Sequence, residues 1–183
     1  MNSKEQRFWT YAAVVASAIF ATLLMGRPLQ HMLRDQNVQA VFFLSGMLLV
    51  GGAILVHGLR LRPSKRELAI WIGLAAVFVM FVFRLGAPER SHLIEYSVLA
   101  IFIHKALSER WRESSSIWRP ALMAWLFTFL IGVVDESIQY WLPERVFDTE
   151  DIVFNGIAAT MAIGGSLIVH WARERFGGKD ESR

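Results

Sequence analysis

Long runs of apolar residues, separated by short polar segments, make up most of the chain. A membrane-spanning helix needs about 20 mainly apolar residues, because that length at about 1.5 Å per residue crosses a hydrocarbon core about 30 Å thick. Six runs reach or approach this length, at residues 8–25, 38–57, 68–85, 92–107, 120–142 and 151–172. The pattern therefore predicts an all-α fold, a polytopic membrane helix bundle with six transmembrane helices.

The segments between these runs are short, polar and rich in glycine and proline, which end helices. They leave no room for a separate soluble domain. We therefore expect a single integral membrane domain over residues 1–183. Two N-terminal spans occupy residues 1–67, a four-helix core occupies 68–172, and residues 173–183 form a polar cytoplasmic tail.

The composition excludes several classes of protein. Hydrophobic residues make up 54% of the chain and charged residues only 19%, which is typical neither of a water-soluble monomer nor of a disordered chain. The chain has no cysteine, so a disulfide framework, a thiolate metal site and a cysteine nucleophile are all excluded. Lipid must cover the apolar surface, and any chemistry must use other side chains.

Lysine and arginine fall unevenly on the two sides of the expected bundle. Of the 19 basic residues, 14 lie on the side that holds both termini and 5 on the other. Basic residues close to spans resist translocation, so both termini are predicted to be cytoplasmic. The same rule accounts for the clusters of basic residues, and no nucleic-acid partner is expected.

Three of the predicted spans carry polar groups close to one end. Such groups are costly in lipid, so they usually face the interior of a bundle and often mark function. On each span, residues three or four positions apart share a helix face. The polar groups are His92, Glu95 and Tyr96 on the fourth span, Asp135, Glu136 and Gln139 on the fifth, and Asp151 and Asn155 on the sixth.

The predicted topology places these three sets at the same level. The fourth and sixth spans enter the membrane from outside, and the fifth span leaves toward the outside. The short loop between the fifth and sixth spans adds Arg145 and Asp148. We therefore predict one polar cluster that opens outward. Asp135 and Glu136 indicate function most strongly, because adjacent acids inside a lipid-spanning helix need a partner or must stay protonated.

Binding and catalysis both fit these residue types. Asp135, Glu136 and His92 are candidate catalytic residues, since carboxylates and an imidazole can exchange protons with a substrate. A guanidinium suits phosphate, and carboxylates and amides suit hydroxyl groups. The candidate binding residues are Glu95, Tyr96, Gln139, Arg145, Asp148, Asp151 and Asn155.

Other interpretations stay open at these positions. Imidazole and carboxylates also bind zinc, but a single histidine without cysteine is a weak signal, so we assign no metal site and no cofactor. Asp148 and Asp151 would also serve as caps of the sixth helix. Arg145 would also neutralise a neighbouring acid, and His92 would also be a solvated residue at the membrane interface.

Together, these motifs resemble the VanZ-like family of bacterial membrane proteins, which is associated with resistance to the glycopeptide teicoplanin. The family pattern joins a His-x-x-x-Tyr segment, an acid-Glu-x-x-Gln helix end, a short loop with proline and arginine, and an Asp-x-x-x-Asn helix start. The matching residues are His92 and Tyr96, Asp135, Glu136 and Gln139, Pro143 and Arg145, and Asp151 and Asn155. The resemblance covers residues 85–172, within the predicted four-helix core.

The resemblance implies a multi-pass protein of the bacterial inner membrane that acts in cell-envelope homeostasis or glycopeptide resistance. Its partners would be membrane lipids, and a lipid-linked envelope precursor or a glycopeptide. With the outward cluster, this favours a pocket for an envelope lipid head group or precursor. Two alternatives stay open: a membrane-embedded hydrolase or transferase that uses Asp135 and Glu136, and a structural subunit of a membrane complex.

Overall fold

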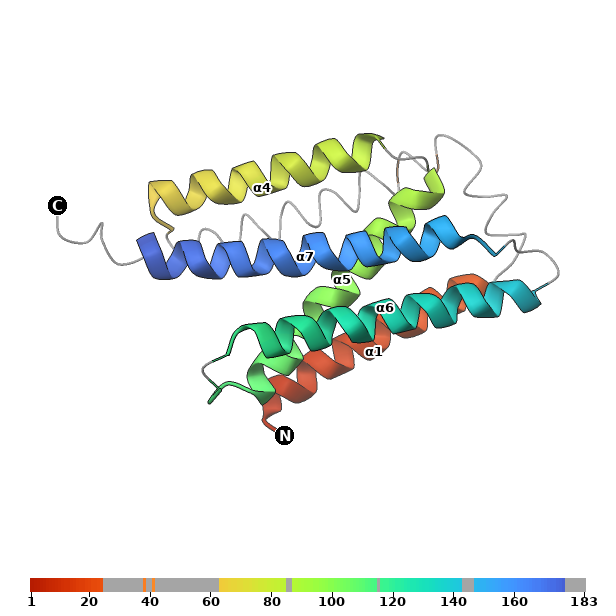
Figure 1. The fold of residues 1–183 in the computed structure, drawn as a ribbon, viewed down its shortest axis with the longest axis horizontal. Helices are drawn as coiled ribbons and strands as arrows, with labels where there is room; N and C mark the ends of the chain where they lie inside the picture. Colours follow the sequence, from red (N-terminus) through yellow and green to blue (C-terminus); the bar gives the residue numbers. More distant parts are fainter. Residues whose placement is uncertain are drawn as a thin grey trace.

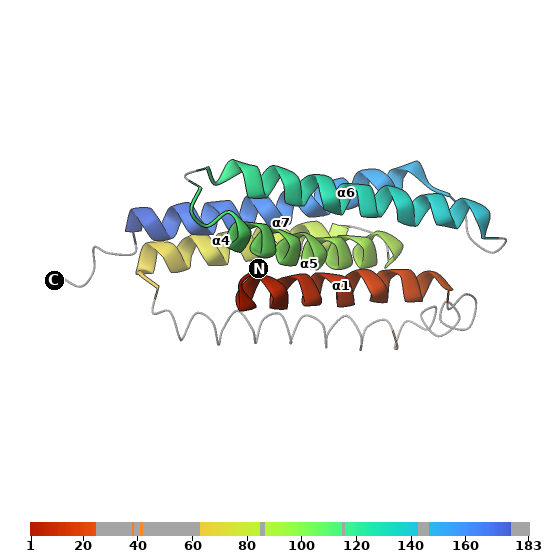
Figure 2. The ribbon, with the colours of Figure 1, turned by 90° about the horizontal axis from the view of Figure 1, so that it is seen from below.

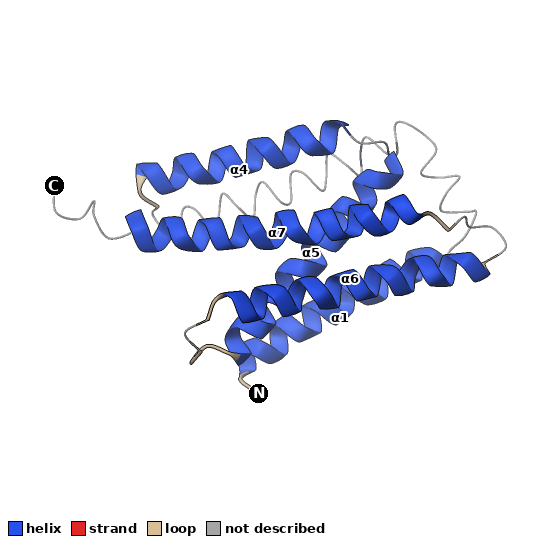
Figure 3. Ribbon diagram, viewed as in Figure 1, coloured by secondary structure: helices blue, strands red, loops and turns tan. Residues whose placement is uncertain are grey.

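Helices account for nearly all of the residues that the structure describes. The computed structural model describes residues 1–24, 63–84, 87–114, 116–142 and 147–176, together with the single positions 38 and 41. Its helices are α1 (Ser3–Leu24), α4 (Lys65–Arg84), α5 (Ala87–Arg110), α6 (Trp118–Trp141) and α7 (Thr149–Phe176). No strand occurs among these residues (Figure 3), so the expected all-α class is confirmed.

From α4 to α7 successive helices run in opposite directions, and α1 runs the same way as α4 (Figure 1). At one end of the bundle, α1, α4 and α6 begin and α5 and α7 finish. We call this the basic end, because it holds Arg66, Lys105, Arg110, Arg119 and Arg173. The opposite end is the acidic end, which holds Glu95, Asp135, Glu136, Asp148 and Asp151.

The helices are longer than the apolar runs that predicted them. The apolar run at 92–107 lies inside α5, which begins at Ala87 and takes Pro88 into its first turn. Proline is tolerated there, since an N–H in the first turn has no partner within the helix. Helix α7 continues to Phe176, into the segment expected to be a polar tail, and that tail stays a prediction. The predicted second span at 38–57 lies, apart from Val38 and Val41, outside the described residues.

Helix α5 lies at the centre of the bundle. It packs against α1, α6 and α7, and Figure 2 shows it between α1 and the layer formed by α6 and α7. Leu93, Leu99, Ala100 and Ile103 of α5 are buried in the core. Because α5 is covered on several sides, its apolar residues do not follow a single stripe.

Helices α6 and α7 are joined by an aromatic contact in the middle of the bundle. The indole nitrogen of Trp125 donates a hydrogen bond to the hydroxyl of Thr160 at 2.9 Å. Trp125 also stacks on Phe129, with ring centroids 5.0 Å apart, and Phe129 covers the face of α7 at Gly156. These contacts hold α7 in register against α6, which fixes the heights of their polar residues.

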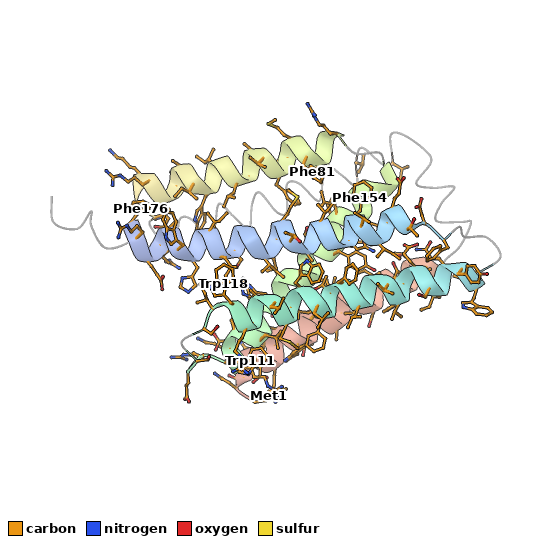
Figure 4. The ribbon with its side chains drawn as sticks, in the orientation of Figure 1. Met1, Phe81, Trp111, Trp118, Phe154 and Phe176 are labelled. Atoms are coloured by element: carbon orange, nitrogen blue, oxygen red, sulfur yellow. The ribbon has the colours of Figure 1, made fainter. Side chains whose placement is uncertain are left out.

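Ion pairs and a capping box hold the basic end together. Glu5 of α1 lies 3.9 Å from Arg110 of α5, and Glu67 of α4 lies 4.0 Å from Arg173 of α7. Ser64 and Glu67 form a capping box, because the Ser64 hydroxyl accepts from the Glu67 N–H and the Glu67 carboxylate accepts from the Ser64 N–H. Figure 4 shows Trp111, Trp118 and Phe176 at this end, where bulky aromatics are typical of a membrane interface.

Helices α6 and α7 are long and apolar enough to cross a membrane, by length and composition. On α6, the side chains of Leu122, Leu126, Leu130 and Val134 follow one another at four-residue spacing, and all four are exposed. A continuous exposed apolar stripe is unfavourable in water and favourable against lipid chains. The opposite face of α6 carries the acids and is buried. The count of six spans and the cytoplasmic termini stay predictions.

Candidate functional site

Two stacked layers of residues meet at the acidic end, where α5, α6 and α7 come together. Each helix supplies two residues four positions apart, which lie on one helix face. The pairs are His92 and Tyr96 on α5, Gly132 and Glu136 on α6, and Asp151 and Asn155 on α7. Because α6 runs opposite to α5 and α7, the later residue of its pair belongs with the earlier residues of the other two pairs. The end layer is His92, Glu136 and Asp151, and the inner layer, one turn deeper, is Tyr96, Gly132 and Asn155.

The end layer brings an imidazole and two carboxylates into contact. His92 Nε2 lies 3.6 Å from Asp151 Oδ2, and the nearest side-chain N or O atoms of His92, Glu136 and Asp151 all lie within 4.8 Å of one another. The Glu136 side chain is fully buried, whereas those of His92 and Asp151 are 16% and 21% exposed. The layer is therefore reached from the end of the bundle through His92 and Asp151.

The carboxylate of Glu136 is held in place by two donors. Gln139 Nε2 donates to Oε1 at 2.7 Å, and the backbone N–H of Asp148 approaches Oε2 at 3.4 Å. Asp148 in turn accepts from the N–H of Glu150 at 2.8 Å, which makes it the N-cap of α7. The capping role anticipated for Asp148 is thus present, and it also fixes the distance between α7 and Glu136.

The inner layer is closely packed. The Tyr96 hydroxyl donates a hydrogen bond to Asp135 Oδ2 at 2.9 Å, and the ring of Tyr96 stacks on His92 with centroids 6.1 Å apart. Asn155 is fully buried, and neither atom of its amide has a hydrogen-bond partner among the residues that the structure describes. A buried amide without a partner costs about 1–3 kcal/mol, so it calls for an explanation.

Gly132 makes this packing possible and escaped the sequence analysis. A Cβ atom at Gly132 would lie 2.9 Å from Asn155 Nδ2 and 3.2 Å from Tyr96 Cε1. Only glycine leaves room there for both side chains. The available signal was its position four residues before Glu136, on the same face of α6, but a glycine offers no chemistry of its own and was passed over.

Three further predicted site residues are Glu95, Gln139 and Arg145, and the structure describes the first two. Glu95 is partly buried and lies close enough to His92 and Asp135 to interact electrostatically with both. Gln139 is buried and donates its side-chain hydrogen bond to Glu136. Arg145 lies outside the described residues, so the phosphate-binding role anticipated for it stays a prediction.

The motif residues that the structure describes therefore converge from three helices. A family model described as VanZ/LLP1 matches residues 8–170 of the chain. The chain belongs to the VanZ/LLP1 family. No curated protein matches the chain, and no solved structure does. The VanZ/LLP1 match reaches further than the motif region at 85–172, because it also takes in α1 and α4.

VanZ/LLP1 membership links the chain to glycopeptide resistance and, with the two apolar helices α6 and α7, supports a membrane protein. Within the family region, the acidic end offers carboxylates from three helices, the imidazole of His92 and the buried amides of Gln139 and Asn155. Such a set can accept hydrogen bonds from hydroxyl or amino groups, bind a cation, or move a proton. A function at the acidic end would therefore use hydrogen-bond acceptance, cation binding or proton transfer.

Proposed function

We propose that this protein acts at the outer face of the bacterial inner membrane, where the acidic end binds the polar head group of an envelope lipid or a lipid-linked envelope precursor. The observation that carries the proposal is the convergence of Asp135, Glu136 and Asp151 from two antiparallel helices at a single end of the bundle. An ionised carboxylate accepts hydrogen bonds and donates none. The favoured ligand therefore carries hydroxyl or amino donors.

Aromatic side chains around the acidic end support a location at the membrane surface. Tyr140 and Trp141 are 69% and 82% exposed, and Tyr140 contacts the ring of Phe147 edge to face. Large amphipathic rings concentrate where lipid chains meet head groups. The site would then lie level with lipid head groups, which a precursor anchored in the outer leaflet reaches without leaving the membrane.

The VanZ/LLP1 assignment supports a role in glycopeptide resistance or envelope homeostasis. A protein that binds lipid-linked precursors could lower the amount accessible to a glycopeptide. Binding of the glycopeptide itself through its lipid anchor would use the same donors and acceptors. Teicoplanin is therefore included among the ligands to be tested.

Retention of lipid by the purified protein tests the proposal. We would measure retained lipid by native mass spectrometry, using phosphatidylglycerol, phosphatidylethanolamine, a lipid-linked sugar precursor and teicoplanin. Glu136→Gln should lower retention of the bound species about tenfold or more, since losing one charged hydrogen bond costs about 1.5–3 kcal/mol. The control is Glu174→Gln, a change in an exposed acid at the basic end. Equal retention by wild type and Glu136→Gln for every species would contradict the proposal.

A second candidate function is a membrane-embedded hydrolase or transferase. The 3.6 Å approach of His92 to Asp151, beside the buried Glu136, favours it, because an imidazole next to carboxylates can act as a general base. Turnover of the same lipids by wild type, lost in Glu136→Gln and in His92→Gln, would establish the enzyme. Retention of lipid without turnover would contradict the enzyme and support the binding proposal.

A further inference from the structure

We infer that His92, Glu136 and Asp151 bind a divalent transition-metal ion, with zinc the best match. The three ligand atoms come from α5, α6 and α7 and all lie within 4.8 Å of one another. The inference does not depend on head-group binding, since the metal alone is the ligand.

The spacing of the end layer fits a metal centre closely. Zinc binds histidine nitrogen and carboxylate oxygen at about 2.0–2.2 Å, so two ligands of a tetrahedral ion lie about 3.3–3.5 Å apart. His92 Nε2 and Asp151 Oδ2 are 3.6 Å apart, which requires a movement of a few tenths of an ångström at most. The Glu136 carboxylate lies within 4.8 Å of both other ligand atoms, so a rotation of its side chain that moves an oxygen by about 1 Å completes the set.

The surroundings of Glu136 are those of a positioned metal ligand. Ligand carboxylates are commonly held by outer hydrogen bonds, which fix their orientation. Gln139 and the Asp148 N–H supply one such donor to each oxygen of Glu136. Since a carboxylate has about four lone-pair sites, these two donors leave capacity for an ion.

The buried amide of Asn155 is an independent observation at the same place. Asn155 follows Asp151 by four residues on the same face of α7, directly beneath the end layer, and its Nδ2 lies against Gly132. It is fully buried without a hydrogen-bond partner among the described residues. A water bound to the inner side of the metal ion would supply the partner that this amide requires.

The ligand set selects the type of ion. One imidazole favours zinc, iron, copper or nickel over magnesium, and the absence of cysteine disfavours soft ions such as Cu(I). Two carboxylates also balance the charge of a divalent ion. Three protein ligands leave a fourth position open, as catalytic zinc sites do. We therefore take Zn²⁺ as the first probe and Mn²⁺ as the second.

Metal content of the full-length protein in detergent tests the inference. The protein is stripped with a chelator, loaded with Zn²⁺, desalted and measured by mass spectrometry, and its melting temperature is compared with and without Zn²⁺. We expect one zinc per chain and a zinc-dependent rise in melting temperature. Glu136→Gln and Asp151→Asn should each weaken zinc binding at least tenfold, and Asn155→Ala should weaken it about tenfold.

The chain provides a matched control at its other end. His170 Nδ1 and Glu174 Oε1 are also 3.6 Å apart, but they are exposed and form only a pair. Glu174→Gln should leave zinc binding unchanged. If Glu136→Gln fails to fold, as judged by gel filtration, His92→Gln and Asp151→Asn replace it, because both side chains lie at the accessible edge of the layer.

Three results would overturn the inference. They are no zinc on the wild type at about 100-fold excess, equal binding by wild type and the folded variants, or a loss of zinc in Glu174→Gln. Failure of lipid retention with zinc binding intact would contradict only the head-group proposal, and the reverse result would contradict only the metal site.

Discussion

The hydroxyl of Tyr96 donates a hydrogen bond to Asp135 Oδ2 at 2.9 Å, which joins α5 to α6 across 39 positions of the chain. Both side chains are buried. Tyr96 also stacks on His92, so the same residue supports the end layer from below. The hydrogen bond therefore couples the packing of the bundle to the geometry of the candidate site.

We expect Tyr96→Phe to destabilise the protein by about 1–3 kcal/mol, because the buried carboxylate of Asp135 loses the hydrogen bond from Tyr96 while the ring is kept. Unfolding at increasing concentrations of a denaturing detergent, monitored by circular dichroism, would measure the change in the free energy of unfolding. Tyr140→Phe is the control, since Tyr140 is exposed, and should stay within about 0.5 kcal/mol of wild type. A Tyr96→Phe variant as stable as wild type would show that the bond contributes no net stability.

Gly132→Ala should destabilise the protein by about 1–3 kcal/mol, because the added methyl group would lie 2.9 Å from Asn155 Nδ2 in a closely packed layer. At Gly164, no described atom outside the local helix backbone would lie within 4 Å of an added Cβ. Gly164→Ala should therefore be neutral or stabilise by up to about 1 kcal/mol, through helix propensity alone. The same unfolding assay compares the two variants, and equal effects would contradict the close packing at Gly132.

The sequence predicted the part of the site that depends on spacing within single helices. His92 with Tyr96 and Asp151 with Asn155 share a face by their spacing, and alternating spans place their helices in the same direction. Gly132 could not be found in this way, because its role depends on the distance to Asn155 on another helix. Contacts between helices are set by packing, which a single sequence does not contain.

The basic end shows the same limit for charged residues. In the sequence, Glu5 and Glu67 stand just before the apolar runs that start at residues 8 and 68, and nothing in their spacing indicates a partner. In the structure both are buried and lie beside Arg110 and Arg173 of other helices. Hydropathy predicted where the helices lie, but the partners of these acids depend on which helices become neighbours.

Ser64→Ala should destabilise the protein by about 0.5–2 kcal/mol, because α4 loses the side-chain oxygen that accepts the Glu67 N–H. The matched control is Ser137→Ala, which removes an exposed hydroxyl bonded to the carbonyl of Val133 on its own helix. That bond adds little to a helix interior, so the control should stay within about 0.5 kcal/mol of wild type. Thermal unfolding of both variants checks the difference, and an unaffected Ser64→Ala would contradict the capping role.

The acidic end must face outward if it meets envelope lipids, and the absence of native cysteine allows this to be tested directly. Thr149 lies exposed at the acidic end and Ser114 exposed at the basic end, so each can be replaced by a single cysteine. In spheroplasts, a membrane-impermeant maleimide should label Thr149→Cys at once and Ser114→Cys only after lysis. The excess of lysine and arginine at the basic end is the physical reason, since these residues resist translocation. The reverse labelling would place the acidic end in the cytoplasm, and binding of outer-leaflet precursors there would then be contradicted.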